Sequence, residues 1–456
     1  MYCVISGPVE TFSGYGAHAR DITRELIRIY PDWTINIIPQ RWGATPRNYL
    51  QPGRDDDILS RLIGTKLPKQ PDIWIQITVP NEFNPIGKVN IGITASVETT
   101  KPPADFLEGV NRFDLTIVVS KFLKDVFEKL KYTQYNRATN QPVGELVLQK
   151  PISVLFEGED PEIFKPIIEF PDIPLVRFLD SIEEDFCYLY VGHWLQGDLG
   201  HDRKDTGMML KTFIETFKNK QKDVALIMKS SQGSYSCVDQ ANMIERINAL
   251  KGDSEKPNIY LVHGELTNEE LNILYNHPKV KTMITTTHGE GFGRPLLEFC
   301  FVGKPIIAPN WSGHTDFLDK KYCTLLPGEL KNVHKSVGLK KMLLDDAYWF
   351  YANHFYFGQT MIDHYKNYGK YKTKAEKLME INRKKYTLNK MGDVLKEMLD
   401  PILPKTPEVI PLNLPDLKKI NAPNLKKLKL PNTDEMPSLK KLDKSKLDEL
   451  IKNTKK

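Results

Sequence analysis

Short apolar segments alternate with longer amphipathic ones along most of the chain, as they do in proteins built on parallel β-sheets. The chain opens with an apolar strand predicted at 2–6 and a loop, Ser-Gly-Tyr-Gly, at 13–16. Apolar residues at helical spacing then predict a helix around 19–29, and a second strand is predicted at 33–38. This order is the βαβ unit of a parallel sheet, whose ligands bind beyond the carboxyl ends of the strands.

The same alternation continues and then restarts after an interruption. Further strands are predicted at 73–79, 89–94, 115–119 and 152–155, and in the second half at 186–191, 224–228, 259–262, 280–285 and 305–308. A segment rich in Pro and acidic residues, 160–184, separates the two series and is interpreted as a crossing between domains. Helix starts are predicted at Ser120, at the capping box of Thr267 and Glu270, and at Pro295. Two consecutive α/β domains are expected.

The pattern changes twice more toward the C-terminus. Beyond 319 we expect helices, with the aromatic run 348–357 packing helices that cross between domains. From 401 the unit Pro-x-Leu-Lys-Lys-[Ile/Leu] occurs three times, at 415–420, 423–428 and 437–442. With few aromatic residues and frequent Pro, this tail is expected to be largely disordered or peptide-like. The predicted divisions are 1–165, 166–345, 346–400 and 401–456.

Composition narrows the function classes. A chain of 456 residues suits two core-forming domains, and its formal charge of +5 raises the question of nucleic-acid binding. Residues 402–456 hold 13 Lys against 7 acidic residues, whereas the first 401 residues carry 50 basic and 51 acidic groups. The body therefore lacks the positive surface that grips phosphate backbones nonspecifically.

Cysteine usage and the N-terminus bear on the compartment. The five cysteines form no C-x-x-C pair, which favours a reducing environment. No basic and apolar leader opens the chain, and no apolar run approaches the ~18 residues of a membrane span. We expect a soluble, cytoplasmic protein with no membrane span.

The stretch 287–298, Thr-His-Gly-Glu-Gly-Phe-Gly-Arg-Pro-Leu-Leu-Glu, carries the chemistry. Glu290 lies among glycines at 289, 291 and 293, which allow backbone amides to approach a ligand closely. Pro295 begins a helix whose N-terminus favours an anion such as a diphosphate, and the Glu298 carboxylate can accept hydrogen bonds from sugar hydroxyls. The stretch predicts a sugar-phosphate cradle. A glycine turn without a ligand, or the acid pair of a glycoside hydrolase, are the alternatives, although such acids usually come from separate elements.

The chain resembles retaining glycosyltransferases of the GT-B fold, family 4 in particular. Their signature of two glutamates separated by seven residues, followed by G-x-P-[IV]-I-A, is matched by 290–298 and 303–308. Collinear similarity also covers the glycine loop 13–16, the segments 97–102, 154–166 and 186–192, Arg203-Lys204, and 264–271. The resemblance spans about residues 1 to 370. It implies two Rossmann-like domains facing a cleft, followed by C-terminal helices.

The resemblance also implies residue roles. Glu290 would hold the transferred sugar together with Gly291, Phe292 and Gly293, and Glu298 would bind the ribose. Lys204 and Arg203 would neutralise the diphosphate leaving group, with Lys229 as a second candidate, and Gly14 and Gly16 would close on the phosphates. Glu98 would face the reacting carbon and orient or deprotonate the acceptor. No metal and no further cofactor is expected, because fixed cations can stabilise the departing charge.

Several polar residues near these motifs have two interpretations. Many family members have an arginine soon after 192, where this chain has His193 and Trp194, so Arg203 is the candidate to take over that role. His288 is a candidate for touching the sugar. His18 is a candidate for facing the cleft, although a partly exposed histidine is the commoner case. The acidic and histidine-containing loop 196–205 is expected to be a solvated loop rather than a metal site.

The predicted function is transfer of a sugar from a nucleotide-diphosphate-sugar to an acceptor hydroxyl on a polysaccharide, lipid, protein or other glycan. One alternative is a glycosyltransferase acting on modified bases in DNA, suggested by the Lys-rich tail. Another is a noncatalytic GT-B scaffold that recruits a partner through that tail, and a nucleotide-sugar epimerase is a third. A protein or nucleic-acid partner for residues 402–456 is left open.

Overall fold

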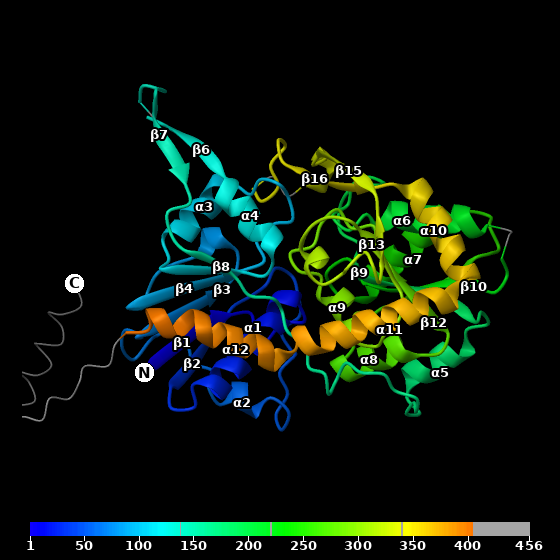
Figure 1. Ribbon diagram of the computed structural model, residues 1–456, viewed down its shortest axis with the longest axis horizontal. Helices are drawn as coiled ribbons and strands as arrows, with labels where there is room; N and C mark the ends of the chain where they lie inside the picture. Colours follow the sequence, from blue (N-terminus) through cyan, green and yellow to red (C-terminus); the bar gives the residue numbers. More distant parts are fainter. Residues whose placement is uncertain (137, 219–220, 339–340, 405–456) are drawn as a thin grey trace, which may run out of the picture. The chain divides into compact units, whose positions relative to one another are not determined.

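The computed structural model describes residues 1–404 except 137, 219–220 and 339–340, and these form one compact unit. The basic repeats predicted in 405–456 lie outside the described residues. Two six-stranded parallel sheets and the helices around them make up most of the unit, as the alternating pattern predicted (Figure 1). Within the described part of the chain, no helix is both long and apolar enough to cross a bilayer.

The first sheet forms from the N-terminal third of the chain. Its strands, in spatial order, are β2 (Thr34–Pro39), β1 (Tyr2–Gly7), β3 (Ile73–Ile77), β4 (Val89–Thr94), β5 (Leu115–Val118) and β8 (Ile152–Val154). Its helices are α1 (Gly14–Ile29), α2 (Asp56–Leu59), α3 (Ala104–Asn111) and α4 (Lys121–Lys129), with a 3₁₀ turn at Pro80–Glu82. The inner strands β1, β3, β4 and β5 are buried on both faces, which is why they are largely apolar in the sequence.

The second sheet follows after the predicted crossing. Its spatial order is β11 (Asn258–Val262), β10 (Val224–Ser231), β9 (Phe186–His193), β12 (Val280–Ile284), β13 (Ile306–Pro309) and β14 (Thr324–Leu326). Its helices are α5 (Pro174–Ser181), α6 (Thr206–Phe217), α7 (Cys237–Lys251), α8 (Asn268–Asn276) and α9 (Arg294–Cys300). Strand order reverses between β9 and β12, which is the place where doubly wound sheets bind ligands.

Two of the predicted helix starts are confirmed by cap hydrogen bonds, and the third, Pro295, lies in the first turn of α9. Ser120 accepts a bond from the amide of Leu123 at 3.4 Å, and both bonds of the Thr267 and Glu270 capping box are present. A left-handed Gly303, at φ +69°, follows α9 as expected for a residue beyond a helix end.

The aromatic run corrects one prediction. Its first part, Tyr348–Ala352, is strand β16, paired antiparallel with β15 (Gly328–Asn332), and the helix α10 (His354–Lys366) begins only afterwards. Aromatic side chains favour strands when a partner strand is present, and the sequence pattern did not reveal β15. Helices α3, α5 and α7 and the hairpin of β6 (Lys131–Tyr135) and β7 (Pro142–Val147), which projects in Figure 1, were also not predicted. The remaining 3₁₀ turns are Gly313–Asp316, Lys335–Val337 and Asp400–Ile402.

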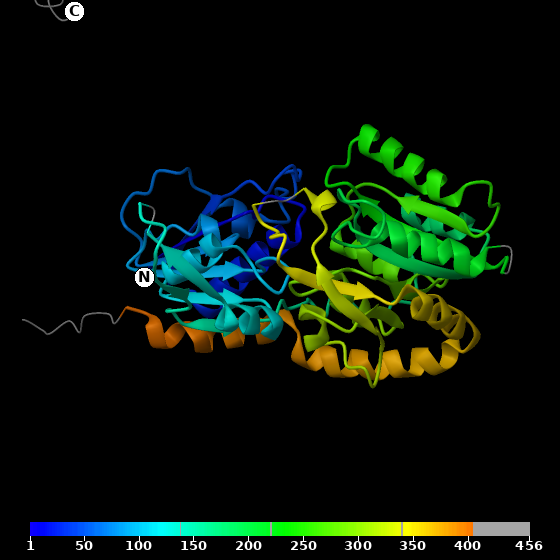
Figure 2. The same cartoon turned by 90° about the horizontal axis from the view of Figure 1, so that it is seen from above.

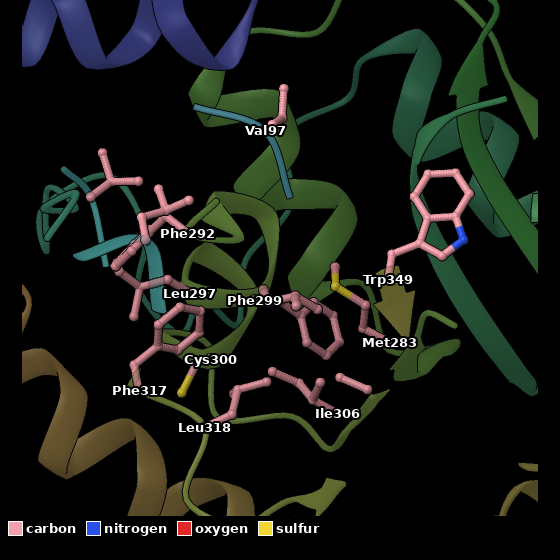
Figure 3. Packing of buried hydrophobic residues seen from close by; sticks show 14 of the residues in the cluster. Val97, Met283, Phe292, Leu297, Phe299, Cys300, Ile306, Phe317, Leu318 and Trp349 are labelled. Carbon is pink, nitrogen blue, oxygen red and sulfur yellow. The ribbon is translucent and has the colours of Figure 1, made fainter. Parts of the chain in front are cut away.

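One buried apolar cluster contains residues from the elements around both sheets. Val97, after β4, belongs to the same buried cluster as Phe292 and Leu297 near the start of α9 (Figure 3). Phe292 lies against Phe317 with ring centroids 5.1 Å apart, and Leu297 and Phe299 are fully buried. Close packing of these buried side chains therefore fixes the position of the start of α9.

The last helices return the chain to the first sheet. Helix α11 (Tyr368–Lys385) lies beside α9, and α12 (Leu388–Leu399) lies alongside α1, as Figure 1 shows and Figure 2 shows from above. Three fully buried side chains of α12 join the apolar cluster of the first sheet: Met391, Leu395 and Leu399. Gly392 permits the close approach, because a Cβ there would collide with the Glu25 carboxylate on α1.

Leu395→Ala should therefore destabilise the protein by about 2–5 kcal/mol, since it removes a fully buried side chain between α12 and α1. Urea unfolding followed by circular dichroism measures this. Lys390→Ala, at an exposed position of the same helix, is the control. Equal stability of the two variants would contradict the packing of α12 as a structural element.

Candidate functional site

The predicted site residues gather at the carboxyl ends of strands from both sheets. Arg203 and Lys204 lie in the loop after β9, and Glu290 lies in the loop after β12, so the two loops flank the reversal of strand order. From the first sheet, the glycine loop follows β1 and Glu98 follows β4. Elements far apart in the sequence thus contribute to one region.

The loop that carries Glu290 is closely covered by the segment after β4. A Cβ on Gly289 would lie 2.7 Å from the Cβ of Glu98, and one on Gly291 would lie 3.0 Å from the Cβ of Ala95. Gly293 has a left-handed φ of +98° and leads into α9. The loop is fastened from the other side by Ser312, whose hydroxyl accepts a 2.9 Å bond from the Glu290 amide. Glycine is required here by contact with the first domain.

Two ion pairs lie side by side at this junction. The ammonium group of Lys204 pairs with the carboxylate of Glu290, and Nη1 of Arg203 lies 2.8 Å from Oε1 of Glu98. All four side chains are between 11% and 21% exposed, so solvent screens these charges only weakly. The second pair joins the two domains.

Charge governs the protonation of this group. Burial favours the neutral acid for Glu290, but Lys204 and Arg203 outweigh it and hold the pKa of Glu290 below its ordinary value. Burial and the neighbouring Arg203 lower the pKa of Lys204, although Glu290 opposes them. Burial also disfavours the charged form of Arg203, yet the carboxylates of Glu98 and Glu290 raise its pKa above the ordinary value. Glu290 and Arg203 are thus both held in their charged forms.

A third cation, Lys229, lies at the end of β10. Its ammonium group donates to the carbonyl of Gly264 at 2.7 Å, and burial lowers its pKa to about 8. His193 lies at the end of β9. Burial lowers its pKa to about 4, and the charges of Arg203, Lys204 and Lys229 contribute to this shift. Three cations thus lie near the ends of β9 and β10; two are paired with carboxylates, and Lys229 is engaged with the backbone and not with Glu290.

Glu298 lies in a crowded group of charged side chains. Its Oε2 accepts a 2.8 Å bond from the hydroxyl of Tyr275, and its Oε1 lies 3.3 Å from Nε of Arg294. Arg294 also contacts Asp21 on α1 at 2.6 Å and Glu159 at 3.0 Å. A ligand hydroxyl that binds Glu298 must share its oxygens with these two partners.

The glycine loop differs between its two glycines. Gly16 packs so closely that a Cβ would collide with the carbonyl of Thr11, and its amide donates to the cap residue Ser13 at 2.9 Å. Gly14 is exposed and has no atom within 4 Å of the place where a Cβ would be. Only Gly14 has free space around it.

Two candidate histidines are buried. His288 is fully buried, stacks on Trp349 with centroids 4.6 Å apart, and has its ring nitrogens next to the carbonyls of Phe350 and Gly200. Both of its ring nitrogens are thus engaged by backbone carbonyls inside the protein. The expectation of a partly exposed His18 is wrong: it is 3% exposed, and burial followed by the charge of Arg294 lowers its pKa to about 3.

The loop 196–205 is solvated only in part, because Gln196, Asp198 and Leu199 are exposed whereas the acidic residues toward its end are buried. Asp202 and Asp205 are each 1% exposed. The carboxylate of Asp202 accepts the amides of Thr206 and Gly207 at the start of α6, and Asp205 lies 2.8 Å from the ring of His354. Their role here is to fix the turn that presents Arg203 and Lys204. Among the described residues, no three His, Cys, Asp or Glu side chains are placed to hold a metal ion.

Three residues of the region were not predicted from the sequence. Tyr15, between the two glycines, bonds through its hydroxyl to the Ala95 amide at 2.8 Å and stacks on Trp42 at 4.0 Å. The other two are Asp21 and Arg294, which form the 2.6 Å ion pair between α1 and α9. Arg294 stands inside the glutamate motif, so its position was visible, but its partners are 273 and 135 residues away in the chain.

Comparison with known proteins identifies the fold. No protein-family model matches the chain, and no curated protein is similar in sequence. Among solved structures, HepE from Anabaena in complex with UDP and glucose aligns with 88% of this chain and 100% of its own, at 12% identity and a TM-score of 0.57.

Two further solved structures align over nearly their whole length. Sucrose-phosphate synthase from Thermosynechococcus elongatus aligns with 88% of this chain and 98% of its own, at 12% identity and a TM-score of 0.57. A glycosyltransferase from Rickettsia africae aligns with 89% of this chain and 99% of its own, at 15% identity and a TM-score of 0.59. The chain has the GT-B fold of two Rossmann-like domains, as predicted.

The carboxyl group of Glu157, next to Arg294, gives a pH-dependent prediction. Burial raises its pKa to about 7, although Arg294 opposes the shift. Because the folded pKa exceeds the unfolded value near 4.5, the contribution of the protonated acid to stability is fully present below about pH 4.5. That stability is lost as the pH rises toward 7, by on the order of 3 kcal/mol. Glu157→Gln should make the loss of stability between pH 5 and pH 8 smaller than in the parent protein, which urea unfolding at the two pH values measures. Glu162→Gln, at an exposed position of the same segment, should retain it; a decline of equal size in Glu157→Gln would contradict the assignment.

Proposed function

We propose that the protein is a retaining glycosyltransferase that moves a sugar from a nucleotide-diphosphate-sugar to an acceptor hydroxyl. The observation that carries the proposal is the placement of Glu290, in its glycine loop, against Lys204 and beside the pair of Arg203 and Glu98. The structural neighbours support it, because HepE has been solved with UDP-glucose and with UDP and glucose. Retention and membership of family 4 rest on the resemblance of the glutamate motif.

The donor would bind across the carboxyl ends of β9, β10 and β12. Its diphosphate is an anion and would compete with the Glu290 and Glu98 carboxylates for Lys204 and Arg203. Lys229 adds positive charge at the end of β10. The exposed Gly14 offers an amide from the first domain. These groups would let the donor's phosphates replace the ion pairs that fill the region in this structure.

Sugar transfer breaks the bond between the anomeric carbon and the diphosphate oxygen. Negative charge develops on that oxygen, and Arg203 and Lys204 would stabilise it from fixed positions without a metal ion. Glu290, held ionised by its neighbours, would accept hydrogen bonds from the sugar hydroxyls, and the amides of 291–293 would donate hydrogen bonds to the sugar oxygens. Glu298 would accept a hydroxyl of the ribose on the lone pairs that Tyr275 and Arg294 leave available.

The acceptor hydroxyl would approach from the first domain. Glu98 lies at the junction and would orient this hydroxyl and receive its proton as the new bond to the anomeric carbon forms. Donor binding would free Glu98 for this role, because Arg203 would turn from Glu98 to the diphosphate. Contact between Gly289 and the Glu98 segment would keep water out of the closed junction.

A donor screen tests the proposal. The full-length protein is incubated with UDP-, ADP- and GDP-sugars and a mixed acceptor panel, and products are identified by mass. Slow hydrolysis of the donor reports activity even where the true acceptor is missing from the panel. Release of neither nucleotide nor product from any donor, in the presence of folded protein, contradicts the proposed function.

Glu290→Gln should reduce turnover of the active donor by at least about 10² while leaving the fold intact. The variant keeps the size of the side chain but removes the charge that pairs with Lys204. Thermal unfolding checks the fold, and Glu329→Gln, an exposed substitution on β15, is the matched control. Near-normal turnover by Glu290→Gln would remove Glu290 from the mechanism.

A further inference from the structure

Arg294 is the first residue of α9 and directly follows the glycine loop of Glu290. Its guanidinium contacts carboxylates on several elements. Nη1 lies 2.6 Å from Asp21 and 3.9 Å from Glu157, and Nη2 lies 3.0 Å from Glu159. Nε lies 3.3 Å from Glu298 on its own helix. One arginine thus joins four carboxylates.

Three of these carboxylates lie outside the second domain's own helix, on α1 and on a segment that connects the two domains. Asp21 lies on α1, five residues beyond Gly16 on the same helix. Glu157 and Glu159 lie on the segment by which the chain leaves the first sheet after β8. The backbone of Glu159 also accepts the amide of Leu388 at 2.9 Å and donates to Tyr386 at 2.9 Å, where the chain returns to the first domain. Both crossings meet at Glu159, whose side chain pairs with Arg294.

The contact is buried, and its several directions suit an arginine. Arg294 is 12% exposed and Glu159 is fully buried. Burial raises the pKa of Glu159 well above its ordinary value, although Arg294 opposes it. A planar guanidinium can donate in several directions at once, whereas a lysine ammonium concentrates its charge at one point. Lysine at 294 would keep the charge but lose part of the set of contacts.

We propose that Arg294 is a positioning residue that fixes the first domain against the donor loop. Its pair with Asp21 ties the helix of the glycine loop to the loop of Glu290, and its pair with Glu159 ties both to the crossings. The register between Glu98 and Arg203 depends on this attachment, because those residues meet from opposite domains. The catalytic consequence rests on the proposed function, whereas the attachment itself does not.

Interdomain distances measured by paired spin labels test the attachment. One label is placed on the native Cys237, exposed on α7, and the other on Glu108→Cys, exposed on α3, in a Cys323→Ser background. Asp21→Asn and Arg294→Lys are compared with Asp57→Asn. The control also removes a carboxylate that pairs with an arginine of α1, at 2.9 Å, but within the first domain.

Asp21→Asn and Arg294→Lys should broaden or shift the distance distribution, and Asp57→Asn should leave it as in the parent. Thermal unfolding checks that each variant is folded. If Arg294→Lys does not fold, Asp21→Asn still tests the inference. An unchanged distribution in the folded variants, or an equal change in Asp57→Asn, overturns the inference.

Kinetics supply the second measurement. If Arg294 positions the domains, Asp21→Asn should lower kcat for the active donor by about tenfold, while the KM for the donor changes less than about threefold. An unchanged kcat would overturn the positioning role. Absence of donor turnover in the parent protein contradicts the proposed function alone, because the spin-label distances still decide whether Arg294 holds the domains together.

Discussion

Arg203 and Lys204 are cations removed from most of the solvent, and a cation in that position needs an anion within contact distance. Glu290 and Glu98 meet this need, one from each domain. The requirement explains why the segment after β4 lies so close to the glycine loop after β12 and why glycine stands at 289 and 291. It also gives the site its chemistry, because an arrangement that accommodates two carboxylates between fixed cations can exchange them for a diphosphate.

The periodicity of the sequence was sufficient for most of the sheets. Strands such as β4 and β10 are buried on both faces and appear as apolar runs, and the helix starts at Ser120 and Thr267 have side chains whose cap bonds are local. Strand β16 was mistaken for a helix because its identity depends on β15, a polar and exposed partner that the pattern did not mark. Local signals were informative wherever the determining contact was local.

The same difference between local and long-range contacts decides which site residues could be predicted from the sequence. Glu290, Glu298, Arg203 and Lys204 stand in a motif or in neighbouring positions, so spacing and resemblance were enough to select them. Burial of His18 and the inward turn of His288 depend on neighbours from other parts of the chain, and so does the attachment of Arg294 to Asp21. A long-range ion pair leaves no period in the sequence, and for that reason no pattern indicated which carboxylates Arg294 would contact.

The parallel bridge between Glu159 and Thr387 has a mechanical consequence. Two chain segments that each run singly between domains can twist independently, whereas two segments hydrogen-bonded to each other behave as a short ribbon. A ribbon bends readily across its width and resists torsion. Relative movement of the two domains would then be confined to opening and closing about one axis, so that Glu98 and Arg203 meet in the same alignment at every closure.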